Sequence, residues 1–449
     1  MGGLVSSSGI RGVAMEEVTP SLLMRIGIAL GSERKGCQIV GHDVRSSSPL
    51  LARALACGIN ASGSDVQFLG LAPTPAVAFY SRKKRGGAMV TASHNPPKYN
   101  GVKIFDENGA SIAEDRYSAL IERSRDSSRV APWNSPGSTL RGAGLYDYIA
   151  STASAARLGK KWRVGLDLGN GASVVTAPVA LAEAGCSVTA INIAPDGAFP
   201  GRGAEPSEEA LSQLSGVVRS KGLDIGFAFD GDGDRLSVVD ERGVFIPQDS
   251  LLAFVASTMV RRAGAGKVVV NVDTSAAVDI AVEEAGGAVV RTKVGDPHIL
   301  RSMLDAGAVF GGETCGAWIF PAHSLCPDGL LSSIVLMGLI EEEGLAPSDI
   351  AARVPRLSLT RLKIRCEPAL KGKVLEGIVP MASGAFKGSS IEATDGIRIS
   401  MGDKSWVLIR PSGTEPLIRI TAEARDRRSS EDLARRASAM VESLVGGSK

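Results

Sequence analysis

Three aspartates separated only by glycines, Asp230, Asp232 and Asp234, are the residues whose types and spacing most directly indicate chemistry. An apolar run, GFAF, leads straight into them. Carboxylates this close together repel one another unless a cation lies among them, and hard oxygen ligands of this kind suit Mg²⁺ or Ca²⁺. The intervening glycines let the backbone turn so that all three side chains point inward. The segment predicts a site for a divalent ion, and Mg²⁺ is the expected one.

Two other interpretations of this segment are a calcium-binding loop and a purely structural acidic turn. In a calcium loop the three aspartates would take positions 1, 3 and 5 and Glu241 position 12, but position 6 requires a glycine and is Arg235 here. The residues that follow, LSVV, are typical of a strand. A guanidinium beside a metal can hold a phosphoryl oxygen or a carboxylate close to the cation, so Arg235 favours a catalytic magnesium site.

A stiff loop, TASHNPP at residues 91–97, is the second candidate for chemistry. Pro96 and Pro97 fix their own φ angles and restrict the residue before them. A loop of this kind can hold Ser93 in one position, as a nucleophile or phosphoryl carrier requires. Lys103 follows close behind and could serve as a proton shuttle or a phosphate contact. Taken alone, the motif also fits an ordinary proline-containing surface turn.

Two further loops have the composition of ligand-binding turns. RPSGTEPLIRI, residues 410–420, places guanidinium groups, hydroxyls and backbone N–H groups on one turn, as a phosphate-binding loop requires. Its candidate residues are Arg410, Ser412, Gly413, Thr414 and Arg419. GGETCGAW, residues 311–318, is a tight loop in which Glu313 could bind sugar hydroxyls. A β-turn with incidental arginines and a common glycine-rich turn are the respective alternatives.

Three segments that surround these loops repeat one pattern. Each has a buried-strand run, an aspartate with small polar residues suited to a helix N-cap, an alanine-rich amphipathic stretch, a glycine and a second apolar run. The aspartates are Asp43, Asp167 and Asp273, and the glycines are Gly63, Gly185 and Gly286. The pattern predicts three α/β domains of similar design with mixed sheets. From about Leu357 the pattern changes to strands and helices typical of a smaller α+β domain.

The motifs divide among four predicted domains. The expected domains are residues 1–137 with the serine loop, 138–243 with the metal loop, 244–355 with the GGETCGAW loop, and 356–449 with the candidate phosphate-binding loop. A chain of 449 residues is too long for one ordinary core, which supports this number of domains.

Composition excludes some classes of function. The 50 Lys and Arg nearly cancel the 48 Asp and Glu, so no nucleic-acid or membrane partner is expected. Six scattered cysteines without a CxxC pair fit free thiols in a reducing cytosol. No apolar run approaches the roughly 20 residues of a membrane span. We expect a cytoplasmic protein, as a monomer or a homodimer.

TASHNPPKYNGVKIF, DGDGDR, GGETCG and RPSGTEP, in this order and spacing, resemble the motifs of the α-D-phosphohexomutase superfamily. Its members include phosphoglucomutases, phosphomannomutases and phosphoglucosamine mutases. The resemblance spans nearly the whole chain and implies a phosphotransferase (isomerase) that interconverts hexose 6-phosphates and 1-phosphates, with four domains around a central cleft. It also implies a phosphoserine enzyme, bound Mg²⁺ and a sugar 1,6-bisphosphate that acts as intermediate or activator.

The resemblance assigns roles to the candidate residues. Ser93 matches the phosphoryl carrier and a further metal ligand beside the three aspartates. Arg11, in SGIRG, and Lys103 match basic residues near the phosphoserine. Glu313 and Cys315 match the sugar-binding loop, and Arg235 could take charge that develops during transfer. The RPSGTEP residues match the loop that holds the non-reacting phosphate.

The sequence departs from the common family pattern in the sugar-binding loop, where Cys315 replaces a serine and Ala317 a histidine. Asp296 and Lys103 remain as candidates for proton transfer. The GETCGAW form with the following FPAHSLCPDG, which contains His323, is most similar to archaeal members, many of them assigned as phosphoglucosamine mutases. Glucosamine phosphate is therefore the expected substrate. A phosphomannomutase or phosphoglucomutase, a phosphatase with a related metal loop, and a non-catalytic sugar-phosphate sensor are the alternatives.

Overall fold

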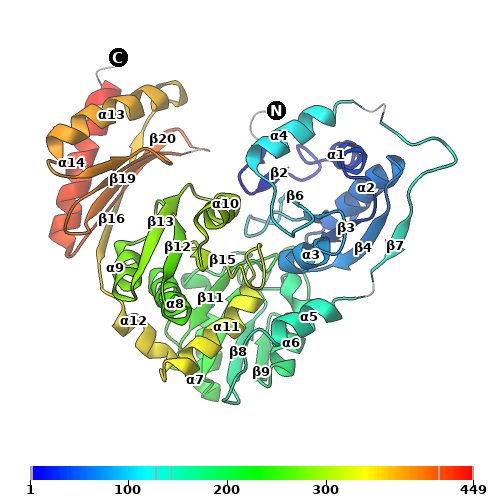
Figure 1. Ribbon diagram of the computed structural model, residues 1–449, viewed down its shortest axis with the longest axis horizontal. Helices are drawn as coiled ribbons and strands as arrows, with labels where there is room; N and C mark the ends of the chain where they lie inside the picture. Colours follow the sequence, from blue (N-terminus) through cyan, green and yellow to red (C-terminus); the bar gives the residue numbers. More distant parts are fainter. Residues whose placement is uncertain (1–3, 127–128, 143, 413–414, 447–449) are drawn as a thin grey trace. The chain divides into compact units, whose positions relative to one another are not determined.

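The computed structural model describes residues 4–126, 129–142, 144–412 and 415–446 (Figure 1). The chain forms two compact units. Unit 1 comprises residues 1–248, 295–301 and 310–351, and unit 2 comprises residues 249–294, 302–309 and 352–449. This division does not delimit the four predicted domains, whose boundaries stay predictions.

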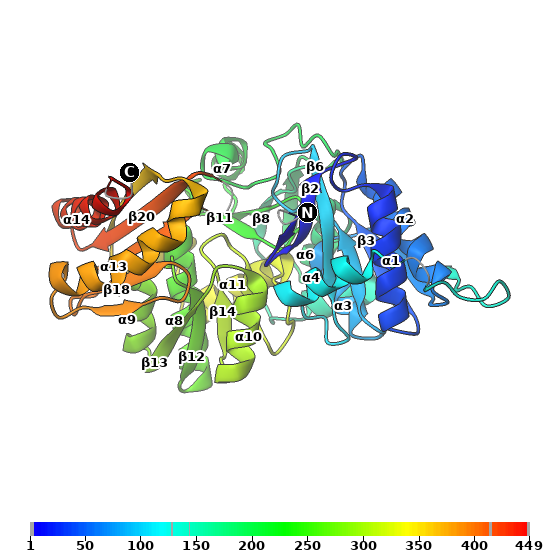
Figure 2. The ribbon, with the colours of Figure 1, turned by 90° about the horizontal axis from the view of Figure 1, so that it is seen from above.

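Unit 1 begins with a seven-stranded mixed sheet in the order β1-β2-β6-β5-β3-β4-β7. Its central strands run parallel, while β6 pairs antiparallel with β5 and β2 antiparallel with β6. The strands are β1 (Val5–Ser6), β2 (Gly9–Val13), β3 (Gln38–His42), β4 (Val66–Leu71), β5 (Gly87–Val90), β6 (Tyr99–Phe105) and β7 (Thr139–Arg141). The helices are α1 (Pro20–Glu33), α2 (Ser48–Ala61), α3 (Thr74–Ser81) and α4 (Glu114–Arg123). Helices α1 and α2 lie side by side over one apolar core (Figure 2).

A second, four-stranded sheet in unit 1 has the order β11-β10-β8-β9, with only β11 antiparallel to its neighbour. Its strands are β8 (Arg163–Asp167), β9 (Ser187–Ile191), β10 (Ile225–Phe229) and β11 (Leu236–Val239), and its helices are α5 (Tyr146–Ala153), α6 (Ala177–Glu183) and α7 (Ser212–Lys221). The same unit holds the start of α10 (Asp296–Ala306), the antiparallel pair β14 (Phe310–Gly312) and β15 (Trp318–Ile319), and the buried helix α11 (Gly329–Glu342).

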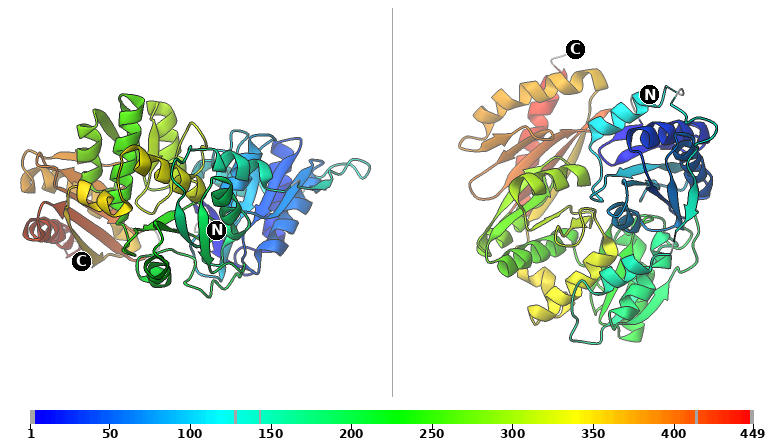
Figure 3. Two further views of the ribbon diagram at one scale, coloured as in Figure 1. Left: turned by 90° about the horizontal axis from the view of Figure 1, so that it is seen from below. Right: turned by 45° about the vertical axis from the view of Figure 1, so that its right-hand side comes forward.

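Unit 2 contains a parallel strand pair and an antiparallel sheet. The pair, β12 (Gly266–Asn271) and β13 (Gly287–Thr292), is accompanied by α8 (Gln248–Ala263) and α9 (Ala276–Glu284). The antiparallel sheet has the order β16-β20-β19-β18-β17. Its strands are β16 (Ser358–Arg365), β17 (Ser390–Glu392), β18 (Ile397–Ser400), β19 (Trp406–Pro411) and β20 (Leu417–Ala424). Helices α13 (Lys371–Ala385) and α14 (Arg427–Gly446) share its apolar core (Figure 3).

The predicted α/β class is confirmed, and so are the three parallel strand–helix–strand units, β3-α2-β4, β8-α6-β9 and β12-α9-β13. Gly63, Gly185 and Gly286 each follow the end of their helix and have φ between 80° and 90°, which is the conformation of a glycine that terminates a helix. None of the three aspartates is the N-cap residue of its helix. The N-cap residues of α2, α6 and α9 are Ser47, Thr176 and Ser275. Ser47 and Ser275 belong to the small polar residues predicted beside the aspartates, and the Ser275 side chain does cap α9. The aspartates make other contacts, described below for Asp43.

Candidate active site

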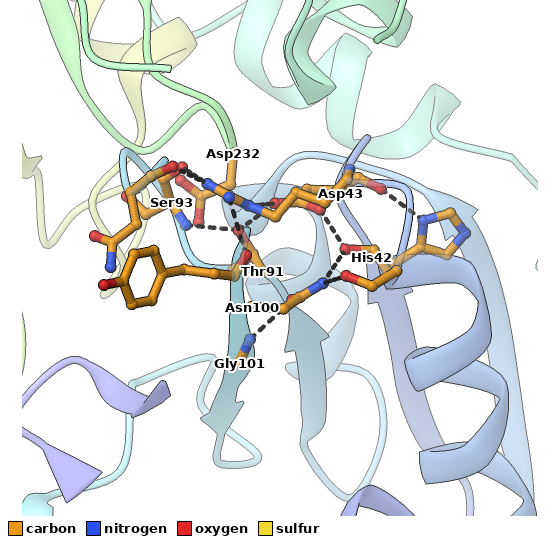
Figure 4. A network of polar contacts seen from close by, with 12 residues as sticks. His42, Asp43, Thr91, Ser93, Asn100, Gly101 and Asp232 are labelled. Atoms are coloured by element: carbon orange, nitrogen blue, oxygen red, sulfur yellow. Dashed lines mark hydrogen bonds and ion pairs between the residues drawn. The ribbon is translucent and has the colours of Figure 1, made fainter. Parts of the chain in front are cut away.

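Ser93 lies in the short loop between β5 and β6. This loop is beside the one that contains Asp230, Asp232 and Asp234. Ser93 is 1% exposed, and its φ of 51° is unusual for a residue other than glycine. The Thr91 hydroxyl accepts the Ser93 backbone N–H at 2.8 Å (Figure 4). The Ser93 hydroxyl donates to Asp230 Oδ2 at 2.7 Å and lies 3.2 Å from His94 Nδ1. The predicted nucleophile is therefore in hydrogen-bond contact with the predicted metal loop.

The imidazole of His94 is neutral in this environment. Burial lowers its pKa to about 2, and the positive charges of Arg235 and Arg11 act in the same direction. Its Nε2 lies 3.8 Å from Glu205, a contact without ionic character at neutral pH. His94 therefore offers Ser93 a neutral ring nitrogen.

Asp230, Asp232 and Asp234 follow directly on β10, and one carboxylate oxygen from each lies within 4.8 Å of those from the other two. All three are buried. Gly233, with φ of 79°, provides the turn between the last two, and its N–H donates to Asp230 Oδ1 at 3.1 Å. Burial and the other two carboxylates raise the pKa of Asp230 well above its ordinary value. The protein holds three acidic groups together against their mutual repulsion.

The donor set fits a hard divalent cation. Asp232 Oδ1 and Asp234 Oδ1 are buried and have no hydrogen-bond partner within the described part of the chain, although buried oxygens of this kind are normally satisfied. Asp232 Oδ2 is oriented by the Thr74 hydroxyl, which donates to it at 2.5 Å. Oriented carboxylate oxygens with unused lone pairs are the ligands that Mg²⁺ binds in proteins.

Two basic residues accompany the aspartates. Lys103, on β6, is 4% exposed; its Nζ lies 3.3 Å from Asp232 Oδ2 and forms an ion pair with Asp234. Burial lowers the pKa of Lys103, but the two carboxylates outweigh it and leave the pKa above its ordinary value. Arg11, on β2, feels the charges of the same two aspartates, and its buried Nε has no hydrogen-bond partner among the residues described.

Arg235 and the GGETCG loop border the same site. Arg235 forms an ion pair with Glu205 at 3.0 Å. Cys315 lies in the turn between β14 and β15; burial raises the pKa of its thiol to about 12 despite the nearby Arg235 guanidinium, so the thiol is neutral. Glu313 is 7% exposed, and its Oε1 accepts the Gly295 N–H at 2.9 Å. This contact places the start of α10, with Asp296, beside the loop.

Asp296 is an acidic group of this region whose pKa lies near neutrality. Burial raises its pKa to about 6, while Lys103 opposes the rise and Asp234 and Glu313 add to it. His323, the other residue considered from sequence, contacts Arg82 through its backbone: the His323 carbonyl accepts from the Arg82 guanidinium at 2.9 Å.

The predicted phosphate-binding residues lie in unit 2. Arg410, at the end of β19, forms an ion pair with Asp395 at 2.9 Å. The Ser412 hydroxyl accepts the Glu415 N–H at 3.2 Å, and Arg419 pairs with Glu415 at 2.8 Å. Gly413 and Thr414 lie outside the described residues. Lys371 Nζ donates to the Ser412 and Glu415 carbonyls at 2.6 and 2.7 Å and closes the base of the turn, a contribution that sequence reasoning missed.

The structure thus brings together, within unit 1, nine of the predicted site residues: Ser93, Arg11, Lys103, Asp230, Asp232, Asp234, Arg235, Glu313 and Cys315. Sequence reasoning missed Thr74, which orients Asp232, and the pair Asp43 and Arg45, which lies under the serine loop. The only available signal was the spacing Asp-x-Arg directly after a buried strand.

No helix within the described residues is long and apolar enough to cross a membrane.

Four family models match successive parts of the chain. They are described as domain I of phosphoglucomutase/phosphomannomutase (residues 3–129), domain II (145–243), domain III (247–357) and the C-terminal domain (362–440). The first three descriptions specify alpha/beta/alpha domains.

Similar proteins cover nearly the whole chain. A protein of Pyrococcus abyssi named "Probable phosphoglucosamine mutase" is 40% identical over 450 residues, which is 99% of each chain. The crystal structure of a phosphoglucomutase/phosphomannomutase family protein from Burkholderia thailandensis has a TM-score of 0.89 and 26% identity, and covers 99% of this chain and 98% of that one. Aspergillus fumigatus N-acetylphosphoglucosamine mutase, solved with GlcNAc-6P and magnesium, has a TM-score of 0.64 at 16% identity, with 98% and 96% covered, which is a likeness of fold alone.

Proposed function

Because the chain belongs to the phosphoglucomutase/phosphomannomutase family, we propose that it interconverts glucosamine 6-phosphate and glucosamine 1-phosphate through a phosphoserine at Ser93. One observation carries the proposal: the Ser93 hydroxyl is held 2.7 Å from Asp230, one of three buried carboxylates. The other two, Asp232 and Asp234, each keep one oxygen that has no hydrogen-bond partner among the residues described. The name of the Pyrococcus relative supports glucosamine phosphate as the substrate.

In the proposed reaction the bond between phosphorus and Ser93 Oγ breaks while a bond forms to the free hydroxyl of a sugar monophosphate. The hydroxyl proton passes to the Asp296 carboxylate, Ser93 Oγ takes up a proton as the phosphoryl group leaves it, and the product is a sugar 1,6-bisphosphate. Lys103, whose raised pKa keeps it protonated, can donate a proton in this step but cannot accept one. After this intermediate turns around, its other phosphate returns to Ser93 Oγ, and the second monophosphate leaves. The net reaction moves the position of one phosphate and consumes no other reactant.

We propose that Asp230, Asp232 and Asp234, with an oxygen of phosphorylated Ser93, hold Mg²⁺. When bound, this ion neutralises charge on the transferring phosphoryl group. The residues of the chain supply the rest of the electrostatic environment. Arg11 brings a positive charge to the same place, and its buried Nε has no hydrogen-bond partner among the described residues. Preorganised cations of this kind stabilise the charge that develops in transfer.

The remaining loops would orient the sugar phosphate. Glu313 is a buried acceptor for sugar hydroxyls, with Cys315 and Arg235 beside it. The non-reacting phosphate would bind the residues of the RPSGTEP loop: Arg410, Ser412, Gly413, Thr414 and Arg419. Recognition of phosphate more than of sugar by this loop would let it accept either end of the bisphosphate.

A substrate panel tests the proposal. Purified protein with MgCl₂ and a trace of glucose 1,6-bisphosphate is assayed with glucosamine 6-phosphate, mannose 1-phosphate and glucose 1-phosphate, and Ser93→Ala serves as the matched control. We expect the highest kcat/KM with glucosamine 6-phosphate and a phosphate adduct on the wild type only, detected by intact mass. A preference for a neutral hexose phosphate would instead indicate a phosphomannomutase or phosphoglucomutase, and an adduct that no sugar phosphate removes would indicate a sensor.

A further inference from the structure

Arg45 is a fully buried arginine beneath the serine loop, in the segment between β3 and α2. Its Nη2 donates to the carbonyls of Ser93 at 2.7 Å and Asn95 at 2.6 Å, and its Nη1 to those of Pro96 at 2.7 Å and Tyr99 at 3.0 Å. Its Nε pairs with Asp43 Oδ2 at 3.0 Å. A guanidinium has five N–H donors, so this one group meets three carbonyls of the serine loop, the first carbonyl of β6 and a carboxylate.

The charge of Arg45 is balanced by a carboxylate that is itself held in place. Asp43 is fully buried; its Oδ1 accepts from the Ser48 hydroxyl at 2.5 Å, and its Oδ2 accepts from the Thr91 hydroxyl at 2.7 Å (Figure 4). Buried ion pairs persist only where further hydrogen bonds satisfy both partners. A lysine at this position would have three donors on a single nitrogen and could not span four carbonyls in a plane.

The same pair of charges fixes Ser93 from both sides. The Thr91 hydroxyl donates to Asp43 and accepts the Ser93 N–H at 2.8 Å, while Arg45 donates to the Ser93 carbonyl. The left-handed φ of 51° at Ser93 is thus held through both peptide groups of the residue. A strained backbone conformation persists only where its surroundings determine it.

The serine loop that Arg45 holds also packs against the loop that contains Asp230, Asp232 and Asp234. The Phe199 ring covers the Arg45 guanidinium, with its centroid 5.2 Å from Cζ. At Gly231, between Asp230 and Asp232, an added Cβ would lie 2.7 Å from the Ser93 carbonyl oxygen and 3.3 Å from the Phe199 ring. The serine carbonyl that Arg45 holds is therefore packed directly against the backbone of the aspartate loop.

We propose that Arg45 is a positioning residue for phosphoryl transfer: anchored on Asp43, it fixes the carbonyls of the serine loop so that Ser93 Oγ stays opposite Asp230. The inference rests on the proposed function. Because a displacement of about 1 Å can reduce transfer about a hundred-fold, the guanidinium acts on kcat. Its hydrogen bonds go to the serine loop, Tyr99 and Asp43, so substrate affinity is unaffected.

The test compares Arg45→Lys with Arg53→Lys, which changes an exposed arginine on α2 in the same domain. The assay uses the substrate of the panel with the highest kcat/KM, together with MgCl₂ and glucose 1,6-bisphosphate. We expect Arg45→Lys to lower kcat about a hundred-fold while its KM stays within about three-fold of the wild-type value, whereas Arg53→Lys matches wild type in both. Adding methylguanidinium to Arg45→Ala should restore part of kcat and leave Arg53→Ala unaffected, a response that loss of stability alone does not give.

Thr91→Val, which keeps the shape of the side chain, provides a second variant if the position-45 variants do not fold. It removes the link between Asp43 and the Ser93 N–H, and we expect a selective fall of kcat of about ten-fold. Wild-type kcat in folded Arg45→Lys overturns the inference, as does unchanged kcat in Thr91→Val. If the wild-type protein turns over no hexose phosphate, the proposed function fails instead.

Discussion

Replacing Asp230 by asparagine should stabilise the metal-free protein while it abolishes the response to Mg²⁺. The substitution keeps the size of the side chain and removes one negative charge from the buried cluster of three. The new side chain would retain an oxygen for the N–H groups of Gly233 and Arg235, which donate to Oδ1 at 3.1 Å each. Its amide could donate to the Ser93 hydroxyl, which would turn from donor to acceptor. Little hydrogen bonding is therefore lost.

The size of the effect follows from the distances between the carboxylates. One oxygen from each lies within 4.8 Å of those from the other two, and at an effective dielectric constant of about 20 two unit charges at that distance repel by roughly 3.5 kcal/mol. Asp230 can avoid repulsion by binding a proton, which costs about 4 kcal/mol at pH 7 relative to an ordinary carboxyl group. That cost is the upper limit of what the variant can regain. Allowing for one weakened hydrogen bond, we expect a gain of about 1–3 kcal/mol.

Calorimetry in EDTA and in MgCl₂ measures both effects. In EDTA, Asp230→Asn should melt a few degrees above wild type; on addition of Mg²⁺ the melting temperature of wild type should rise and that of the variant should not. Asp240→Asn is the matched control, because Asp240 is also buried but accepts the N–H groups of its own turn through Oδ1. A metal-free Asp230→Asn that melts below wild type, together with an undiminished shift in Mg²⁺, would refute the reasoning.

Three further predictions follow from other parts of the structure. Ser93→Ala should lose the phosphate adduct by intact mass and lower turnover by several orders of magnitude without a change in circular dichroism; turnover near that of wild type contradicts the phosphoserine. Asp395→Asn should lower KM for sugar phosphates by a factor of roughly 1.4 to 5 in steady-state assays, since a partly exposed ion pair such as that with Arg410 is worth about 0.2–1 kcal/mol; an unchanged or higher KM contradicts this. Burial raises the pKa of Asp328 to about 7, although hydrogen bonds from Leu331 and Tyr148 act to lower it. The contribution of the protonated carboxyl group to stability is therefore complete below about pH 4 and is lost as pH rises through about 7. The melting temperature should therefore fall more between about pH 5 and pH 8 in wild type than in Asp328→Asn; parallel profiles exclude Asp328 as the source.

The site residues that could be predicted from sequence are those in short motifs at strand ends. Ser93 and Asp230 each follow an apolar run, and β5 and β10 do end at Val90 and Phe229, directly before the two motifs. Because a buried strand that ends in polar residues presents them at one edge of its sheet, local pattern was sufficient to locate both loops. The contact between them joins residues 137 positions apart and was expected only from the family resemblance.

The contacts of Arg45 and Asp43 could not be predicted in the same way. The partners of Arg45 are backbone carbonyls 48 to 54 positions away. Because every residue type has a backbone carbonyl, the sequence does not indicate which ones Arg45 contacts. Asp43 was expected at a helix N-cap because aspartate after a strand often has that role. In the fold, the buried guanidinium two residues on competes for the carboxylate, and an ion pair without access to water outweighs a neutral backbone donor.

The left-handed backbone at Ser93 explains why so many fixed groups surround one hydroxyl. A residue with a Cβ in this conformation costs roughly 1–2 kcal/mol, and glycine would avoid the cost but has no hydroxyl to carry a phosphoryl group. Thr91 and Arg45 hold the two peptide groups of Ser93, and hydrogen bonds to charged groups, as with Arg45, contribute about 1.5–3 kcal/mol, enough to offset that cost. With the backbone fixed on both sides, the side chain keeps a single rotatable bond between Cα and Cβ. The path of the hydroxyl oxygen is then an arc of fixed radius beside Asp230, and the protein controls the position of a transferring group through the backbone.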